Sequence, residues 1–96
     1  MTIPTLRRWS YLIYLHSEQK DTLQAAIAKE FREYRKAYAL SQVQFAKRLR
    51  ISVRSYIDLE HGLFLPSATT LLLFLLQLND QELLSFLSVM EETLQP

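Results

Sequence analysis

The sequence predicts an all-α protein of five helices preceded by an N-terminal segment. Only one glycine and three prolines occur in 96 residues, and no repeat or low-complexity tract is visible, so we expect helices joined by short turns. Apolar residues recur at steps of three and four, which is the spacing of one face of a helix. Because 49% of the residues are hydrophobic, the chain has enough apolar side chains for the core of one compact domain.

The first long helix is predicted from Asp21, which would serve as its N-cap. Its apolar residues recur at steps of four, four, three and four along one face, and they are Leu23, Ile27, Phe31, Tyr34 and Tyr38. A helix with one such stripe packs that face on a core and leaves the other face in water.

Two short helices follow with almost no chain between them. Ser41 opens the second helix, and Gln44 three residues later completes a capping-box pattern. Ser52 caps the third helix, and Gly62 is placed to end it in the left-handed conformation that glycine adopts at low cost. Only residues 50–51 separate the two helices, so they must cross at a steep angle. The sequence therefore predicts a helix-turn-helix.

Two more helices complete the predicted fold. Pro66 and Ser67 start a fourth helix whose leucines point in nearly every direction, so neighbours must cover most of it. Asp80 begins the last helix, whose apolar stripe is wider than a small monomer readily covers. This stripe packs either on its own chain or on a second copy, and we favour a dimer interface. The predicted interface residues are Leu83, Leu84, Leu87, Met90 and Leu94.

The pattern divides the chain into an arm or short helix over residues 1–20, the helix-turn-helix domain over residues 21–78 and the C-terminal helix over residues 79–96. The first part contains Trp9, Tyr11 and Tyr14. These residues pack over the core, extend the dimer or contact a partner, and the sequence does not choose among the three.

The net charge of +1 hides a very uneven distribution of charge along the chain. Residues 29–54 hold eight basic and two acidic residues, whereas residues 55–96 hold six acidic residues and no Lys or Arg. The first segment therefore attracts polyanions and the second does not.

Several classes of function are disfavoured by composition. The chain has no cysteine, which excludes disulfides, thiolate metal sites and cysteine nucleophiles. His16 and His61 lie far apart with no nucleophile or carboxylate pattern around them, and one glycine cannot build a phosphate-binding loop. We therefore expect no enzyme activity, no cofactor and no metal. The longest apolar run, residues 71–76, is too short to span a bilayer, and no signal peptide is visible, so we expect a cytoplasmic protein without a membrane partner.

A spaced set of residues resembles a known family, and its members are Arg35, Leu40-Ser41-Gln42, Phe45-Ala46, Ile51-Ser52, Leu59-Glu60, Gly62 and Pro66. This set is similar to the helix-turn-helix of phage repressors and Cro proteins, the XRE family, over about half of the chain. The resemblance implies a five-helix lambda-repressor-like domain of bacterial or phage type. It also implies a dimeric transcriptional regulator, expected to be a repressor, that binds double-stranded DNA with its third helix in the major groove.

The resemblance assigns roles to individual positions. Contacts to base edges are implied for Val53, Arg54 and Asp58. Contacts to DNA phosphates are implied for Gln42, Lys47, Arg50, Ser52 and Ser55. Arg35 and Glu60 are implied to form a buried salt bridge that ties the first helix to the end of the third. Two positions keep an alternative: Arg54 as a phosphate contact, and Asp58 as an ion-pair partner of Arg54 one turn away.

Three departures from the family pattern keep a second function open. Arg50 stands where the family places glycine, Ile57 is apolar on the recognition helix, and the apolar segment 63–65 replaces polar or basic residues. These features suit a protein-interaction module or an antitoxin-like regulator that also binds a protein. The basic segment favours DNA, because a pure interaction module has no need for positive charge on those helices.

Overall fold

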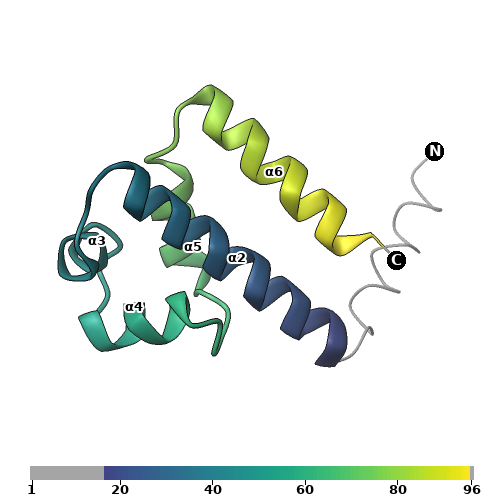
Figure 1. Ribbon diagram of the computed structural model, residues 1–96, viewed down its shortest axis with the longest axis horizontal. Helices are drawn as coiled ribbons and strands as arrows, with labels where there is room; N and C mark the ends of the chain where they lie inside the picture. The colour runs from purple at the N-terminus through teal and green to yellow at the C-terminus, as the bar shows by residue number, and fades with distance from the viewer. Residues whose placement is uncertain (1–16, 96) are drawn as a thin grey trace.

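A computed structural model describes residues 17–95, which form five helices and no strand (Figure 1). The helices are α2 (Ser17–Ala37), α3 (Gln42–Arg48), α4 (Val53–Glu60), α5 (Ala68–Leu75) and α6 (Asp80–Leu94). The two long helices, α2 and α6, pack side by side and run in opposite directions, while α3 and α4 lie on the other side of α2. The predicted all-α class and the five helices are confirmed.

The start of α2 differs from the prediction. The helix begins at Ser17, so Asp21 is an exposed residue within it and the N-cap assignment is wrong. The side-chain amide of Gln19 donates to the carbonyl oxygen of Thr93 at 3.2 Å, which attaches the first turn to the end of α6. A contact with a distant helix thus adds a turn that local capping signals do not reveal. Residues 1–16 of the predicted N-terminal arm lie outside the described residues. They include the aromatic residues of the arm.

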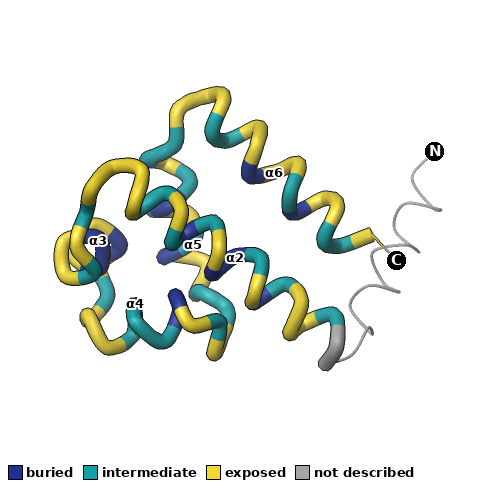
Figure 2. The backbone as a smooth tube through the Cα atoms, viewed as in Figure 1, coloured by how far each residue is buried: buried dark blue, intermediate teal, exposed yellow. Residues whose placement is uncertain are grey.

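Buried positions occur on all five helices (Figure 2). The core that they form is built around aromatic rings, one from each helix. Phe31 of α2 lies 4.2 Å from Phe74 of α5 between ring centroids, and Phe45 of α3 lies 5.3 Å from Tyr56 of α4. Phe86 of α6 meets Phe74 edge to face at 5.4 Å. Such pairs add about 0.5–1.5 kcal/mol each to the stabilisation from burial. All five helices therefore share one core.

The inner face of α6 belongs to this core. Phe86 and Met90 are buried against their own chain, and α6 packs along α2. Met90 is therefore not available to a second copy, and its assignment to the dimer interface is corrected: a periodic stripe does not identify the neighbour that covers it. Leu83 and Leu94 are half-buried, whereas Leu84 and Leu87 are exposed by 67% and 49%.

Three successive helices end in the same way, with one residue in the left-handed region. These residues are Ala39 (φ 55°), Arg50 (φ 58°) and Gly62 (φ 74°). The closing N–H···O bonds run from Leu40 to Arg35 at 2.9 Å, from Ile51 to Ala46 at 3.1 Å and from Leu63 to Asp58 at 3.0 Å. Each is the outer bond of a Schellman motif, which satisfies helix carbonyls that would otherwise lack a donor. Only at Gly62 is the conformation free of side-chain strain.

Replacing Ala39 by glycine should stabilise the protein. The left-handed conformation at φ 55° costs an alanine roughly 1–2 kcal/mol, and the greater freedom of glycine in the unfolded chain offsets part of that gain. We expect Ala39→Gly to raise the free energy of unfolding by about 0.5–1 kcal/mol in urea titrations.

The matched control is Ala25→Gly, the same change at an exposed position inside α2. There glycine should lower the free energy of unfolding by about 1 kcal/mol. Destabilisation by both changes would contradict the strain at Ala39.

Candidate nucleic-acid interface

The turn between α3 and α4 exposes the beginning of α4. The hydroxyl oxygen of Ser52 accepts the backbone N–H of Ser55 at 3.0 Å, and Ser52 lies outside the helix as its N-cap. The two serine hydroxyls also hydrogen-bond to each other at 3.0 Å. Both residues thus lie at the end of α4 where the helix dipole is positive, which favours an anion such as a phosphate.

A buried carboxylate fixes α4 on the other helices. Glu60 is 5% exposed and accepts two hydrogen bonds from Arg35 of α2, from Nε at 2.7 Å and from Nη2 at 2.9 Å. It also accepts from the side-chain amide of Gln42 on α3 at 3.0 Å and from the hydroxyl of Tyr56 on its own helix. Arg35 in turn donates to the carbonyl oxygen of Leu40 at 3.1 Å. This set, the Glu60 cluster (Arg35, Gln42, Tyr56 and Glu60), joins α2, α3 and α4.

Electrostatics of the Glu60 cluster keep the carboxylate ionised. Burial, the largest single effect, raises the pKa of the Glu60 carboxyl, but the hydrogen bonds from Arg35, Tyr56 and Gln42 outweigh it and hold the pKa at about 2. Burial and then the hydrogen bond to Glu60 raise the pKa of Tyr56, which therefore stays a donor. A bidentate pair with a full set of donors is the geometry in which a buried charge is tolerated.

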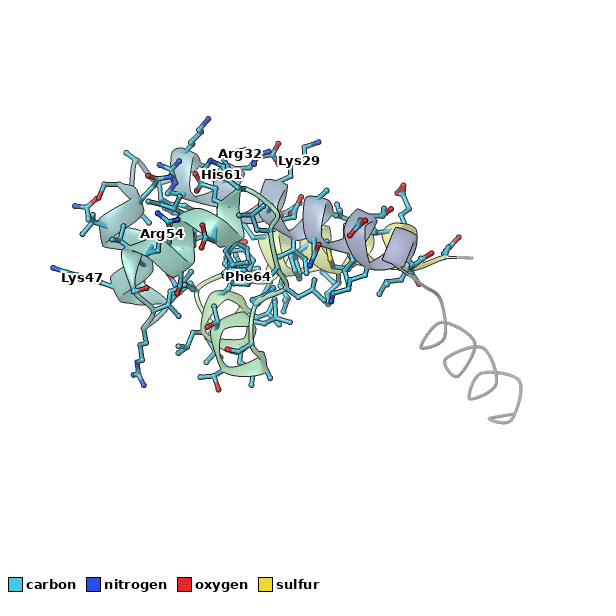
Figure 3. The ribbon with its side chains drawn as sticks, turned by 90° about the horizontal axis from the view of Figure 1, so that it is seen from below. Lys29, Arg32, Lys47, Arg54, His61 and Phe64 are labelled. Atoms are coloured by element: carbon cyan, nitrogen blue, oxygen red, sulfur yellow. The ribbon has the colours of Figure 1, made fainter. Side chains whose placement is uncertain are left out.

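The outer face of α4 presents the residues predicted to read bases. Val53 is exposed, and the side chain of Arg54 is 84% exposed in the first turn (Figure 3). Asp58 Oδ2 lies 3.7 Å from Arg54 Nε, so the predicted pairing one turn apart is present. An ion pair this exposed contributes only about 0–1 kcal/mol, and Arg54 can leave Asp58 for another acceptor at little cost.

The residues predicted to contact phosphates fall into three groups. Lys47 and Arg50 are exposed, and Lys47 extends outward from α3 (Figure 3). Ser52 and Ser55 lie at the N-terminus of α4 as described. Gln42 differs, because its side-chain amide donates to Glu60, and only its backbone N–H in the first turn of α3 is placed to meet an anion.

A second basic group lies at the other end of α4, where sequence reasoning assigned no role. Arg32 of α2 donates from Nη1 to the carbonyl oxygen of Glu60 at 3.1 Å, next to the exposed His61. Lys29 lies one turn before Arg32 on α2, and the three side chains gather at one edge of the molecule (Figure 3). We call Lys29, Arg32 and His61 the α2 flank. The three-residue spacing of Lys29 and Arg32 indicates a shared helix face, but nothing in the sequence places that face beside α4.

The apolar segment after α4 is largely on the surface. Leu63 and Phe64 are exposed, while Leu65 is half-buried against the core. Phe64 lies between α4 and α5 in the same view as Arg54 (Figure 3). The departure from the family pattern noted in the sequence is therefore a true surface feature.

Comparison with known proteins gives the family. A family model described as Helix-turn-helix matches residues 31–79, just over half of the chain. The chain belongs to this helix-turn-helix family. It is a family of DNA-binding regulators, and the match confirms the predicted resemblance to XRE-type proteins. No curated protein and no solved structure matches the chain.

The matched segment of the helix-turn-helix protein begins inside α2 and ends at the N-cap of α6. It contains the whole Glu60 cluster, α3, α4 and α5. The last helix lies beyond it, although Phe86 and Met90 share the same core.

Other kinds of site were sought in the described part of the chain. Residues 17–95 contain no group of three or more His, Cys, Asp or Glu side chains placed to hold a metal ion. Within the same range, no helix has the length and apolar character needed to cross a membrane.

Removing the charge of Glu60 should destabilise the fold before it affects recognition. Glu60→Gln leaves Arg35 partly buried without its counter-charge, so we expect a loss of about 3–5 kcal/mol in the free energy of unfolding. Tyr56→Phe removes one donor to the same carboxylate and should cost about 1.5–3 kcal/mol. Urea titrations followed by circular dichroism measure both changes.

The effect of Glu60 should also depend on pH. Because the folded pKa of about 2 lies below the ordinary value of 4.5, the stabilisation is complete above about pH 4.5 and is lost as the pH falls through 2. The difference in stability between the natural protein and Glu60→Gln should shrink over this range. A difference that stays constant down to pH 2 would show that the charge of Glu60 is not what stabilises the fold.

Proposed function

We propose that the protein is a sequence-specific double-stranded DNA-binding transcriptional regulator, acting as a homodimeric repressor with α4 in the major groove of each half-site. The observation that carries this proposal is Arg54, whose side chain is 84% exposed on the first turn of α4, a helix that the buried Glu60 holds in place. An exposed cation on a fixed helix is suited to reading an edge of a base pair.

Base reading is assigned to three residues of α4. Arg54 can donate two hydrogen bonds to the O6 and N7 of guanine, which is worth roughly 1–3 kcal/mol of discrimination. Val53 beside it offers a methyl surface to thymine. Asp58 holds Arg54 in the free protein and accepts from a cytosine amine once Arg54 turns to a base.

Phosphate contacts would hold α4 at both of its ends. Lys47, Arg50, Ser52 and Ser55 lie on the side of the turn, with the backbone N–H of Gln42 at the start of α3. The α2 flank supplies Lys29, Arg32 and His61 at the opposite end of α4. Charges on both sides of the helix fix its register along the groove, although they do not read sequence.

The proposed dimer uses exposed leucines of the last helix. Leu84 and Leu87 are exposed on α6, and half-buried Leu83 and Leu94 border them. An exposed apolar surface of this kind is typical of a protein contact. A two-fold pairing would place two α4 helices in successive major grooves, about one helical turn apart.

A second candidate function rests on the surface of the α4–α5 loop. Leu63 and Phe64 expose apolar area beside the proposed DNA face. An antitoxin-like regulator would use such a patch to bind a protein, with or without DNA. The DNA-binding experiment below separates these alternatives.

DNA binding should be salt-dependent and should rely on Arg54 for specificity. We expect the chain to bind random duplexes weakly and duplexes enriched by selection tightly, with affinity falling about 10³-fold between roughly 50 and 200 mM salt. Arg54→Ala should weaken binding to the selected duplex by about 1–3 kcal/mol and binding to random duplexes much less. Fluorescence anisotropy measures these affinities.

Lys20→Ala is the matched control, because Lys20 is exposed at the far end of α2 from α4 and its loss should leave affinity unchanged. An equal loss for all sequences in Arg54→Ala would make Arg54 a phosphate contact. Absence of duplex binding at low salt would overturn the DNA proposal and favour the protein-binding alternative.

The dimer should dissociate when its apolar surface is charged. Leu84→Glu combined with Leu87→Glu places two carboxylates at the proposed interface, and both side chains are exposed, so the monomer should keep its fold. We expect sedimentation equilibrium to change from dimer to monomer. Ser85→Glu, also exposed on α6 but not facing the side of Leu84 and Leu87, tests whether any added charge has this effect. A natural chain that is monomeric at all concentrations would contradict the dimer.

A further inference from the structure

A cavity of about 350 Å³ lies between α2 and α6, the two long helices that lie side by side in Figure 1. The proposed DNA-binding function makes no use of it. Its wall combines aromatic rings with carboxylates, and no Lys, Arg or His is among its lining residues. The cavity is within the range of sizes that holds small-molecule ligands.

Four aromatic side chains form the apolar part of the cavity. Phe74 and Phe86 are buried at its base. Tyr34 and Tyr38 line it from the last turns of α2, with their ring centroids 4.5 Å apart. Aromatic rings are negative over their faces, so they attract a cation that has given up its water.

Three carboxylates give the same cavity its charge. Glu30 and Glu33 line it from α2, and Glu82 lines it from α6. Glu82 is fixed there, because it accepts the hydroxyl of Tyr38 at 2.6 Å and the backbone N–H of Asn79 at 2.8 Å. Glu30 has no such donor: burial, followed by the charge of Glu33, raises its pKa, and Lys29 offsets this only in part. A cation in the cavity would relieve that repulsion.

From this charge complementarity we propose that the α2–α6 cavity binds an organic cation, a quaternary or N-methylated ammonium ion. Such a cation is weakly hydrated and prefers ring faces, which matches the exposed ring of Tyr38 beside the carboxylates. Tyr34, Phe74 and Phe86 pack on other rings and complete the apolar wall. A bare divalent metal fits less well, because it requires several oxygen ligands converging on one point. No such group of side chains occurs in residues 17–95.

Choline and its uncharged isostere 3,3-dimethylbutan-1-ol are the probes that test this proposal on the full chain. The two have nearly the same shape and differ in the positive charge, so binding that depends on charge should favour choline by roughly tenfold or more. Chemical-shift changes in two-dimensional NMR spectra report both binding and its location. We expect the shifts to concentrate on α2 residues 30–38 and α6 residues 81–86, which include most of the lining.

Two variants test whether choline binds to the residues that line the cavity. Glu30→Gln should lower the affinity for choline about fivefold. Tyr38→Leu should lower it by a similar factor, because one ring face is lost. Glu91→Gln, an exposed carboxylate of α6 outside the cavity, is the matched control and should have no effect. Circular dichroism verifies that each variant is folded.

Equal affinity for choline and the alcohol would mean that the cavity is only an apolar surface, and the proposal would fail. No shift with choline at a concentration of roughly 50 mM, far above the range of ordinary ligand sites, would also overturn it. Both results leave DNA binding unaffected, so failure of this proposal and failure of the proposed function are distinguishable.

Discussion

The ion pair between Arg35 and Glu60 is the constraint on which the rest of the structure depends. One carboxylate accepts from α2, from α3 and from its own helix α4, and it does so inside the core at 5% exposure. A buried pair of this kind contributes little net stability compared with apolar side chains of the same size, because both charges lose their water. Its effect here is geometric: the directional bonds of Glu60 determine how α4 is oriented on α2. The position of every side chain on the outer face of α4 depends on that orientation.

Local chemistry explains why the helices could be predicted from the sequence. Ser41, Ser52 and Ser67 cap the helices that follow them, and Gly62 ends α4 as expected. These signals act over three or four residues, so the sequence contains them in full. The start of α2 could not be found in this way, because it depends on a contact with the end of α6, 74 residues away along the chain. The predicted dimer interface on α6 was wrong at Met90 for a related reason. The apolar stripe includes Met90, which the core of the same chain covers.

The candidate site also combines features that local spacing predicts with features that only tertiary packing determines. Arg54 and Asp58 could be paired from their spacing, because residues four apart on a helix are neighbours. The α2 flank could not be placed, because Arg32 reaches α4 only through tertiary packing. Gln42 is intermediate: its position at the start of α3 was clear, but its side chain turns inward to Glu60. Charge counted along the sequence thus located the basic segment but not the two ends of α4 at which its side chains gather.

The left-handed Arg50 has a consequence for the thermodynamics of association. Its N–H and that of Ile51 both bond to α3, so the corner between α3 and α4 is closed by backbone bonds and is not a free hinge. A glycine at this corner would have more conformations to lose on folding, whereas arginine restricts the unfolded chain. The two helices can therefore meet a ligand as one preorganised unit, with little ordering entropy lost in the complex. The backbone bonds that close this corner, and not the strain of Arg50, are what limit the entropy lost in binding.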